Sequence, residues 1–269
     1  MLYKISILLL LIFQFRCSAQ LKPGCINAAL GYSNIANEID PFSIFNNPAA
    51  SALASNPSTA IFYSPAPFGL NELSSKAISA GINTKLANIQ AGYSLYGYEL
   101  YKEQKFALAL SFDIQQKFLI GISAIYQNVS IKNYGNDWAI IFLLGGIYRL
   151  TDNFNLAFTI FNPNNTSYGN ENNQIPVYFE AGLAYKISES AQLTSALHKE
   201  LNYPICLTVG FTYKFLRWIS FYGGYKNDTE IFSAGLSVSY SDFTISYGVN
   251  SHSQLGLSHL FGFQFGMDN

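Results

Sequence analysis

The feature that most constrains this chain is an alternation of apolar and small polar residues, which dominates from about Ser58 onward. In the stretch IFSAGLSVSY, residues 231–240, one face carries Phe, Ala, Leu, Val and Tyr, and the opposite face carries Ser and Gly. A period of two places successive side chains on opposite faces of a β-strand. Residues 205–215 and 243–250 repeat the pattern. The chain is therefore predicted to be all-β.

The lengths of the connections between the runs indicate how the strands are arranged. Short connections at 84–86, 114–117, 151–153, 188–190 and 215–217 alternate with longer ones at 64–75, 97–104, 132–137 and 162–174. A soluble sandwich would also show period two, but short turns at one end and long loops at the other are typical of transmembrane barrels. Fourteen strands are expected near 58–63, 76–83, 87–96, 105–113, 118–131, 138–150, 154–161, 175–187, 191–199, 205–214, 218–225, 231–239, 243–249 and 255–266.

The composition agrees with a barrel that spans a membrane. Charged residues make up 12% of the chain, against about 25% in typical soluble domains, while Phe and Tyr number 22 and 19. After the N-terminal region, no run approaches 18 consecutive apolar residues, the length that would indicate a spanning helix. We therefore predict a transmembrane antiparallel β-barrel over residues 58–269, with its apolar faces toward outer-membrane lipid.

The N-terminus, MLYKISILLLLIFQFRCSAQ, has the pattern of a secretory signal peptide. Lys4 precedes a mostly apolar core at 5–13, and the small residues Cys17 and Ala19 fit a signal-peptidase site. We expect residues 1–19 to be removed and the protein to reach the bacterial outer membrane. An uncleaved anchor would need about 20 apolar residues, and a lipid-modified Cys17 would follow Arg16, which is a poor match.

The sequence shows no sign of nucleic-acid binding or of metal-dependent chemistry. Without Lys4 and Arg16, 13 Lys and Arg oppose 16 Asp and Glu, so no basic surface is indicated. The histidines at 198, 252 and 259 are scattered, and no CxxC or Cys/His cluster is present. The sequence therefore predicts no enzyme, no metal site and no cofactor. Cys25 and Cys206 form a candidate disulfide, because the expected compartment is oxidising.

The segment 20–57 differs from everything after it. In DPFSIFNNPAAS, residues 40–51, Asn46 and Asn47 favour a turn, Pro48 fixes φ, and Ala49 permits close packing. Such a kinked polar segment cannot face lipid, because its unpaired backbone groups would each cost several kcal/mol there. It fits inside a barrel whose inward faces are small. The alternative is a periplasmic tail. Strand 138–150 is apolar on both faces and offers a surface against which the segment can pack.

Residues 31–54, GYSNIANEIDPFSIFNNPAASALA, resemble the N-terminal signature of the FadL-type outer-membrane transporters. Relatives in that family include PorV and PorQ, barrel subunits associated with type IX protein secretion. The matching positions are Gly31, Asp40, Phe45 and Asn47-Pro48-Ala49. The resemblance implies that residues 20–57 form a hatch in the lumen, and that small hydrophobic molecules cross passively.

Charged residues on predicted inward faces are candidates for a role in the lumen. Glu180, Lys186 and Lys214 each share a face with small residues. An intramembrane charge is costly unless it meets water or a partner, so we expect ion pairs with one another or with Asp40 of the hatch. Contact with a substrate is the alternative.

Three functions remain open at this point. The first is passive transport of small, mainly hydrophobic compounds across the outer membrane. The second is an accessory barrel that holds secretion-system subunits, as in PorV and PorQ. The third is a structural barrel without transport.

Overall fold

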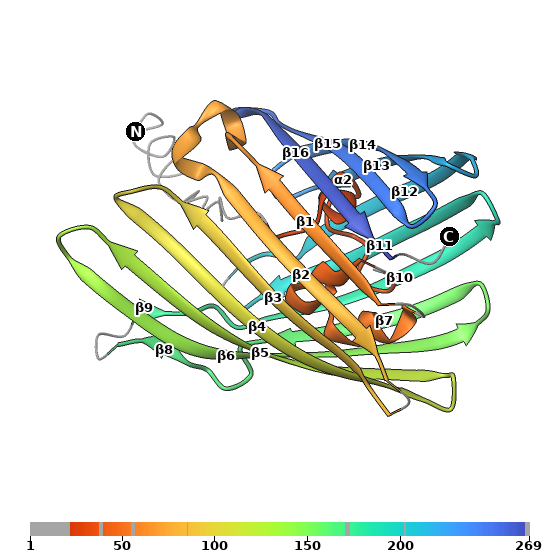
Figure 1. Ribbon diagram of the computed structural model, residues 1–269, viewed down its shortest axis with the longest axis horizontal. Helices are drawn as coiled ribbons and strands as arrows, with labels where there is room; N and C mark the ends of the chain where they lie inside the picture. The colour runs from red at the N-terminus through yellow and green to blue at the C-terminus, as the bar shows by residue number, and fades with distance from the viewer. Residues whose placement is uncertain are drawn as a thin grey trace, which may run out of the picture.

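A computed structural model describes residues 22–37, 40–54, 57–84, 86–169, 173–201 and 203–266, so the predicted signal peptide at 1–19 lies outside the described residues. In this part of the chain, fourteen antiparallel strands form one closed barrel (Figure 1). Each strand pairs with its neighbour in sequence, and β1 closes the barrel against β16. The barrel strands are β1 (Ser58–Ser64), β2 (Ser75–Asn83), β3 (Asn88–Gly97), β4 (Tyr101–Ile114), β5 (Phe118–Ile131), β6 (Gly135–Thr151), β7 (Phe154–Phe161), β10 (Tyr178–Ser188), β11 (Ala191–Glu200), β12 (Cys206–Leu216), β13 (Ile219–Lys226), β14 (Ile231–Tyr240), β15 (Phe243–His252) and β16 (Gly256–Phe265).

The predicted barrel and its strand count are confirmed, but at least half of each of two predicted loops, 97–104 and 132–137, is strand. β4 begins at Tyr101 and β6 at Gly135, because the ladder continues to the pairs Tyr101–Ile131 and Ile131–Gly135. The predicted loop 162–174 contains a small hairpin of β8 (Ser167–Tyr168) and β9 (Asn173–Gln174). The β1–β2 connection holds two short 3-10 helices, η3 (Pro67–Gly69) and η4 (Asn71–Leu73).

The alternation of the sequence becomes the two surfaces of the barrel wall. On β14, Phe232 points outward and is 63% exposed, while its neighbour Ser233 points inward and is buried. The same holds on β4, where Leu108 is 67% exposed between two buried alanines. A closed barrel has no free edge, so this apolar exterior is the surface that lipid can cover. No helix among the described residues is long and apolar enough to cross a membrane.

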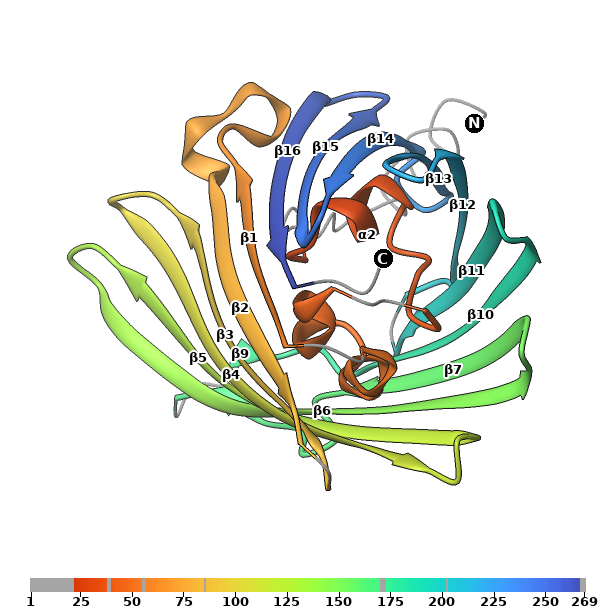
Figure 2. The same ribbon diagram turned by 45° about the vertical axis from the view of Figure 1, so that its right-hand side comes forward.

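The described part of the N-terminal segment lies inside the barrel (Figure 2), which confirms its predicted position in the lumen and contradicts a periplasmic tail for these residues. Its elements are α2 (Cys25–Ala29), η1 (Pro41–Phe45) and η2 (Pro48–Leu53). Both 3-10 helices start with proline in their first turn, where the missing N–H costs nothing. The Asp40 Oδ1 accepts from the Phe42 N–H at 2.7 Å, and the Asn47 Oδ1 accepts from the Ala49 N–H at 3.1 Å.

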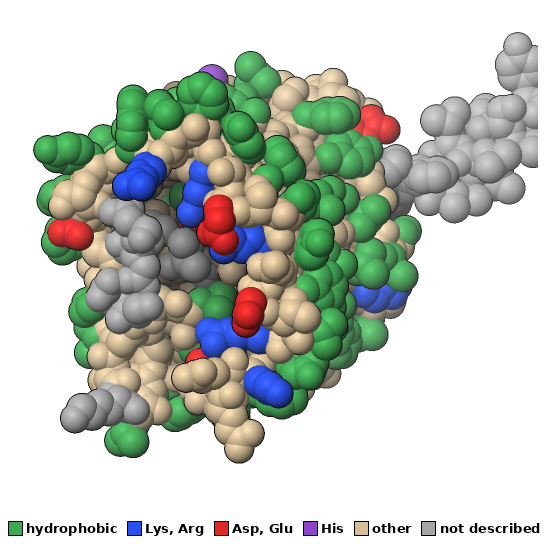
Figure 3. Space-filling model, turned by 90° about the vertical axis from the view of Figure 1, so that its right-hand side faces the viewer, with side chains coloured by type: hydrophobic (Ala, Val, Ile, Leu, Met, Phe, Trp, Pro, Cys, Tyr) green, Lys and Arg blue, Asp and Glu red, His purple; other side chains and the backbone are tan. Residues whose placement is uncertain are grey.

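The short turns gather at one end of the barrel. Figure 3 looks onto this end, where charged side chains lie around the centre of the face and hydrophobic side chains cover its flanks. The longer connections, including η3, η4 and the β8–β9 hairpin, lie at the opposite end. We refer to these as the short-turn end and the long-loop end.

Candidate functional site: the hatch and the cavity beside it

Glycines on the inner wall make room for the hatch. A Cβ on Gly121 would overlap the backbone of Pro48 and Ala49, and a Cβ on Gly145 would overlap the Asn47 side chain. The two glycines face each other across β5 and β6. They therefore form a flat area of wall on which the Asn47–Ala49 turn rests.

The same arrangement continues around the barrel. Gly182 lies against Ile35, Gly210 against Ser33, and Gly224 against the backbone of Leu30 and Gly31. The sequence has Gly-Gly pairs at 145–146 and 223–224. In each pair, one glycine faces the hatch, whereas Gly146 meets the outward Phe158 ring and a Cβ on Gly223 would meet open space.

The two asparagines of the predicted motif hold the hatch together from within. The Asn47 Nδ2 donates to the Ile35 carbonyl at 2.7 Å, which joins two separate parts of the segment. The Asn46 Nδ2 lies 3.4 Å from the Pro23 carbonyl and 3.3 Å from the Phe42 carbonyl. Both side chains are buried, so these hydrogen bonds replace contacts with water.

The apolar part of the hatch packs against β6, as expected from a strand that is apolar on both faces. Phe42 and Phe45 share a buried cluster with Ile141 and Leu143. Ile147 instead belongs to a second cluster with Leu119 and the hatch residues Ile35, Ala36, Ala49 and Ala50. Strand β6 is apolar on both faces because its inner face meets the hatch along much of its length.

Beside the hatch, toward the long-loop end, lies a cavity of about 730 Å³. Its floor includes Pro23, Tyr32 and Phe45 of the hatch. Apolar wall residues include Phe68, Ile125, Val129, Phe161 and Ile175. This volume lies within the range of small-molecule sites, which are mostly apolar with a few fixed polar groups.

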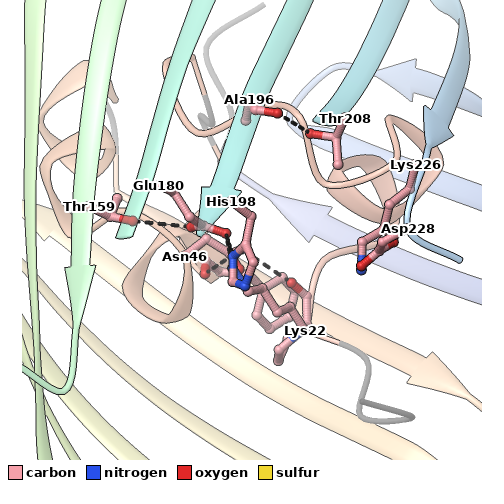
Figure 4. Close-up of polar contacts among 11 residues, drawn as sticks. Lys22, Asn46, Thr159, Glu180, Ala196, His198, Thr208, Lys226 and Asp228 are labelled. Atoms are coloured by element: carbon pink, nitrogen blue, oxygen red, sulfur yellow. Dashed lines mark hydrogen bonds and ion pairs between the residues drawn. The ribbon is translucent and has the colours of Figure 1, made fainter. Parts of the chain in front are cut away.

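Glu180 is the central polar group of this cavity (Figure 4). Its Oε1 accepts from the Lys22 Nζ at 2.8 Å and lies 3.0 Å from the His198 Nδ1. Its Oε2 accepts from the Thr159 hydroxyl at 3.1 Å. Lys22 also lies over the Tyr178 ring, 5.1 Å from its centroid. The network ties the N-terminal part of the hatch to three strands of the wall.

A second carboxylate, Glu103, was not singled out from the sequence. Its Oε1 accepts from the Tyr101 hydroxyl at 2.6 Å, and its Oε2 accepts from the Gln127 Nε2 at 3.0 Å. The strict alternation of β4 could have identified it, since Glu103 shares the inward parity of Ala107 and Ala109. In all, the lining carries Lys22, Lys105 and Lys226 against Glu103, Asp137, Glu180 and Glu200.

The other two predicted lumen charges lie elsewhere. Lys186 pairs with Glu189 at 2.9 Å beside the β10–β11 turn, and Lys214 is exposed near the short-turn end. The expected pairing of these residues with Asp40 is not found. Asp40 is instead buried as the cap of η1, where desolvation raises its pKa to about 7 and the hydrogen bond from the Phe42 N–H opposes that shift.

The considered disulfide between Cys25 and Cys206 is not formed, since both are buried free thiols. Cys25 lies in the hatch, with its Sγ 3.5 Å from the Leu260 carbonyl of β16. Cys206 starts β12, and three strands separate β12 from β16 around the barrel. Among the described residues, no group of three His, Cys, Asp or Glu side chains could hold a metal ion.

The sequence and the fold were both compared with known proteins. No family model and no curated protein matches the sequence. The Ralstonia pickettii toluene transporter TbuX is 12% identical with a TM-score of 0.68, over 91% of this chain and 98% of that chain. The Pseudomonas putida toluene transporter TodX is 12% identical with a TM-score of 0.67, over 93% and 99%. A Pseudomonas aeruginosa FadL homologue is 10% identical with a TM-score of 0.62, over 91% and 98%. The chain thus shares the fold of these hydrocarbon transporters and of a FadL homologue.

Proposed function

We propose that this protein is an outer-membrane barrel through which small, mainly hydrophobic molecules pass without an energy source. The observation that carries the proposal is the cavity at the long-loop end, with apolar and aromatic wall residues between its charged groups, which the hatch separates from the short-turn end. Structural likeness to solved toluene transporters supports the same substrate class.

The charges of the cavity favour neutral molecules. Three lysines face four carboxylates in the lining, so with His198 neutral the net charge is only −1 and gives a charged ligand little electrostatic attraction. Glu180 is already paired with Lys22 and with His198. A neutral apolar molecule would bury its surface against Ile125, Phe161 and Ile175, and would gain about 25 cal/mol for each Å² removed from water.

The hatch determines how a molecule would leave. Because η2 packs closely on β4, β5 and β6, straight passage requires the hatch to shift. We therefore propose entry from the long-loop side, binding beside the hatch, and release after a rearrangement of the hatch or through the wall.

The test is uptake of a small apolar fluorescent probe by intact cells that carry the protein in their outer membrane. Val129→Trp should slow the initial uptake, because Val129 lines the cavity and the indole would fill it. Asn128→Trp is the matched control, since Asn128 is the adjacent residue and points to the opposite face of β5. Equal uptake by both variants and by cells without the protein would make the transport proposal wrong.

One observation keeps the accessory-barrel function as a second candidate. Most connections at the long-loop end are brief, such as residues 132–134 and 227–230, and only the β1–β2 and β7–β10 connections are longer, which leaves part of the rim for a partner. Co-purification with secretion-system subunits, together with unchanged probe uptake in Val129→Trp, would favour this function over transport.

A further inference from the structure

The outer face of the barrel wall carries charge of only one sign. In the described strands, the outward-facing Lys, Arg, Asp and Glu side chains are Lys76, Lys102 and Lys199. The carboxylates of these strands, such as Glu103 and Glu180, point inward. Each of the three lysines lies one residue inside the long-loop end of its strand.

Lys76 and Lys102 lie close together on this face. Lys76 pairs with Leu95 of β3, Leu95 pairs with Gln104 of β4, and Lys102 is two residues from Gln104 toward the loops. Two strand spacings and two residues of rise place their Cα atoms roughly 12 Å apart. Two extended lysine side chains can meet across that distance.

Aromatic and apolar side chains surround the two lysines. The Lys76 Nζ lies 5.5 Å from the centroid of the Tyr63 ring, its cross-strand neighbour. On the other side of the pair, toward mid-strand, the Gln104 Nε2 donates to the Tyr93 hydroxyl, and the Tyr93 ring packs on Phe106 at 4.6 Å. Exposed Ile78 and Leu108 continue the wall beyond them. This order of apolar band, aromatic layer and cation is the order of a membrane interface.

We propose that Lys76 and Lys102 together bind the phosphate of an anionic glycolipid in the outer leaflet, with its acyl chains along β2, β3 and β4. The inference rests on the proposed outer-membrane location and on the long loops facing outward. The outer face of the described strands has no carboxylate to pair with these lysines, and a phosphate would supply that negative charge. The exposed apolar residues below the lysines supply the surface for the acyl chains.

The test uses the full-length protein released from detergent and observed by native mass spectrometry, with bisphosphorylated lipid A as the probe. The same lipid without its phosphates and inorganic phosphate alone form the comparison arms. Lys76→Gln or Lys102→Gln should each weaken lipid A binding about fivefold, and both together about thirtyfold, which corresponds to about 1 kcal/mol for each lysine near an anionic surface. Lys117→Gln with Arg217→Gln, which removes the same charge at the short-turn end, should leave binding unchanged.

Several outcomes would overturn the proposal. Equal binding of the lipid without phosphates would show that only the apolar wall retains it. Binding of inorganic phosphate as tight as that of lipid A would show an ion site and not a lipid site. Loss of lipid A binding in Lys117→Gln with Arg217→Gln, and not in the Lys76 and Lys102 variants, would place the short-turn end and not the long-loop end at the outer leaflet. A further result is lipid A binding that Lys76→Gln and Lys102→Gln leave unchanged while Val129→Trp still slows uptake. That result would reject this proposal and leave the transport proposal intact.

Discussion

Gly121 and Gly145 face each other across β5 and β6, and the hatch turn rests on both of them. Neither position has space for one additional carbon atom, because the hatch backbone and the Asn47 side chain already occupy it. The fit between hatch and wall therefore depends on residues with no side chain at all.

Gly145→Ala should loosen the hatch while the barrel still forms. The added methyl group would overlap the Asn47 side chain, and overpacking of this kind typically costs about 1–3 kcal/mol. Limited proteolysis of the hatch and thermal unfolding would measure the effect. Gly223→Ala is the control, since a Cβ there meets open space. Equal stability of the two variants would contradict the close fit.

Lys22→Met should release the N-terminal part of the hatch, because it removes a 2.8 Å ion pair with a buried carboxylate. Hydrogen bonds to charged groups contribute about 1.5–3 kcal/mol, so the free energy of unfolding should fall by about that amount. A double-mutant cycle with Glu180→Gln isolates the pair. If the two losses simply add, Lys22 and Glu180 are not coupled and the anchor is wrong.

Hatch stability should fall as pH rises toward 8. Burial raises the pKa of Asp40 to about 7 in the folded state, above the ordinary value of 3.8. The stability that the protonated Asp40 carboxyl contributes to the folded state is then fully present below about pH 4, and it is lost as pH rises through 7. Asp40→Asn should remove the dependence, because an amide oxygen can still accept from the Phe42 N–H.

The measurement for Asp40 is the labelling rate of Cys25 with Cys17 and Cys206 replaced by Ser. Burial raises the pKa of the Cys25 thiol to about 12, so labelling reports opening of the hatch. Each rate is divided by that of Asp40→Asn at the same pH, which cancels the reactivity of the thiol itself. Asp242→Asn, at an exposed turn, serves as the control. A ratio that stays flat between pH 5 and 8 would reject the pH dependence.

Deletion of residues 25–54 should leave an inserted barrel with a larger conductance. The hatch fills the lumen between the cavity and the short-turn end, and the wall keeps its complete hydrogen-bond ladder without it. Single-channel recording measures the change, and the shift in gel mobility between heated and unheated samples shows whether the barrel is folded. Unchanged conductance in a folded barrel would show that the hatch is not the barrier.

Phe211→Arg should impair insertion by about 2–4 kcal/mol if this position lies near mid-bilayer. Phe211 points outward from the middle of β12 and is 43% exposed. Thr212→Arg, the next residue on the inward face, should cost less because its guanidinium can reach the lumen. Refolding yield into vesicles would compare them, and equal losses would contradict a lipid-facing exterior.

The sequence by itself determined which side of the wall each residue occupies. A period of two assigns every strand residue to the lumen or to the exterior, the count of alternating runs gives the strand number, and the longest connections, 64–75 and 162–174, mark one end of the barrel. The same alternation assigns the side chains of Lys76 and Lys102 to the outward face. The polar turn at Asn46 and Asn47 could not face lipid, because lipid cannot satisfy its backbone groups, which left the lumen or the periplasm as its place.

Only the tertiary structure decided which inward residues meet. Lys22 and Glu180 are 158 positions apart, and closure of the barrel together with the path of the hatch brings them into contact. The same closure separates Cys25 from Cys206 and leaves Lys186 and Lys214 away from Asp40. Alternation fixes the face of a side chain but not its height along the lumen or its partner across it. Those depend on the strand register of the closed barrel and on how the hatch packs against its wall.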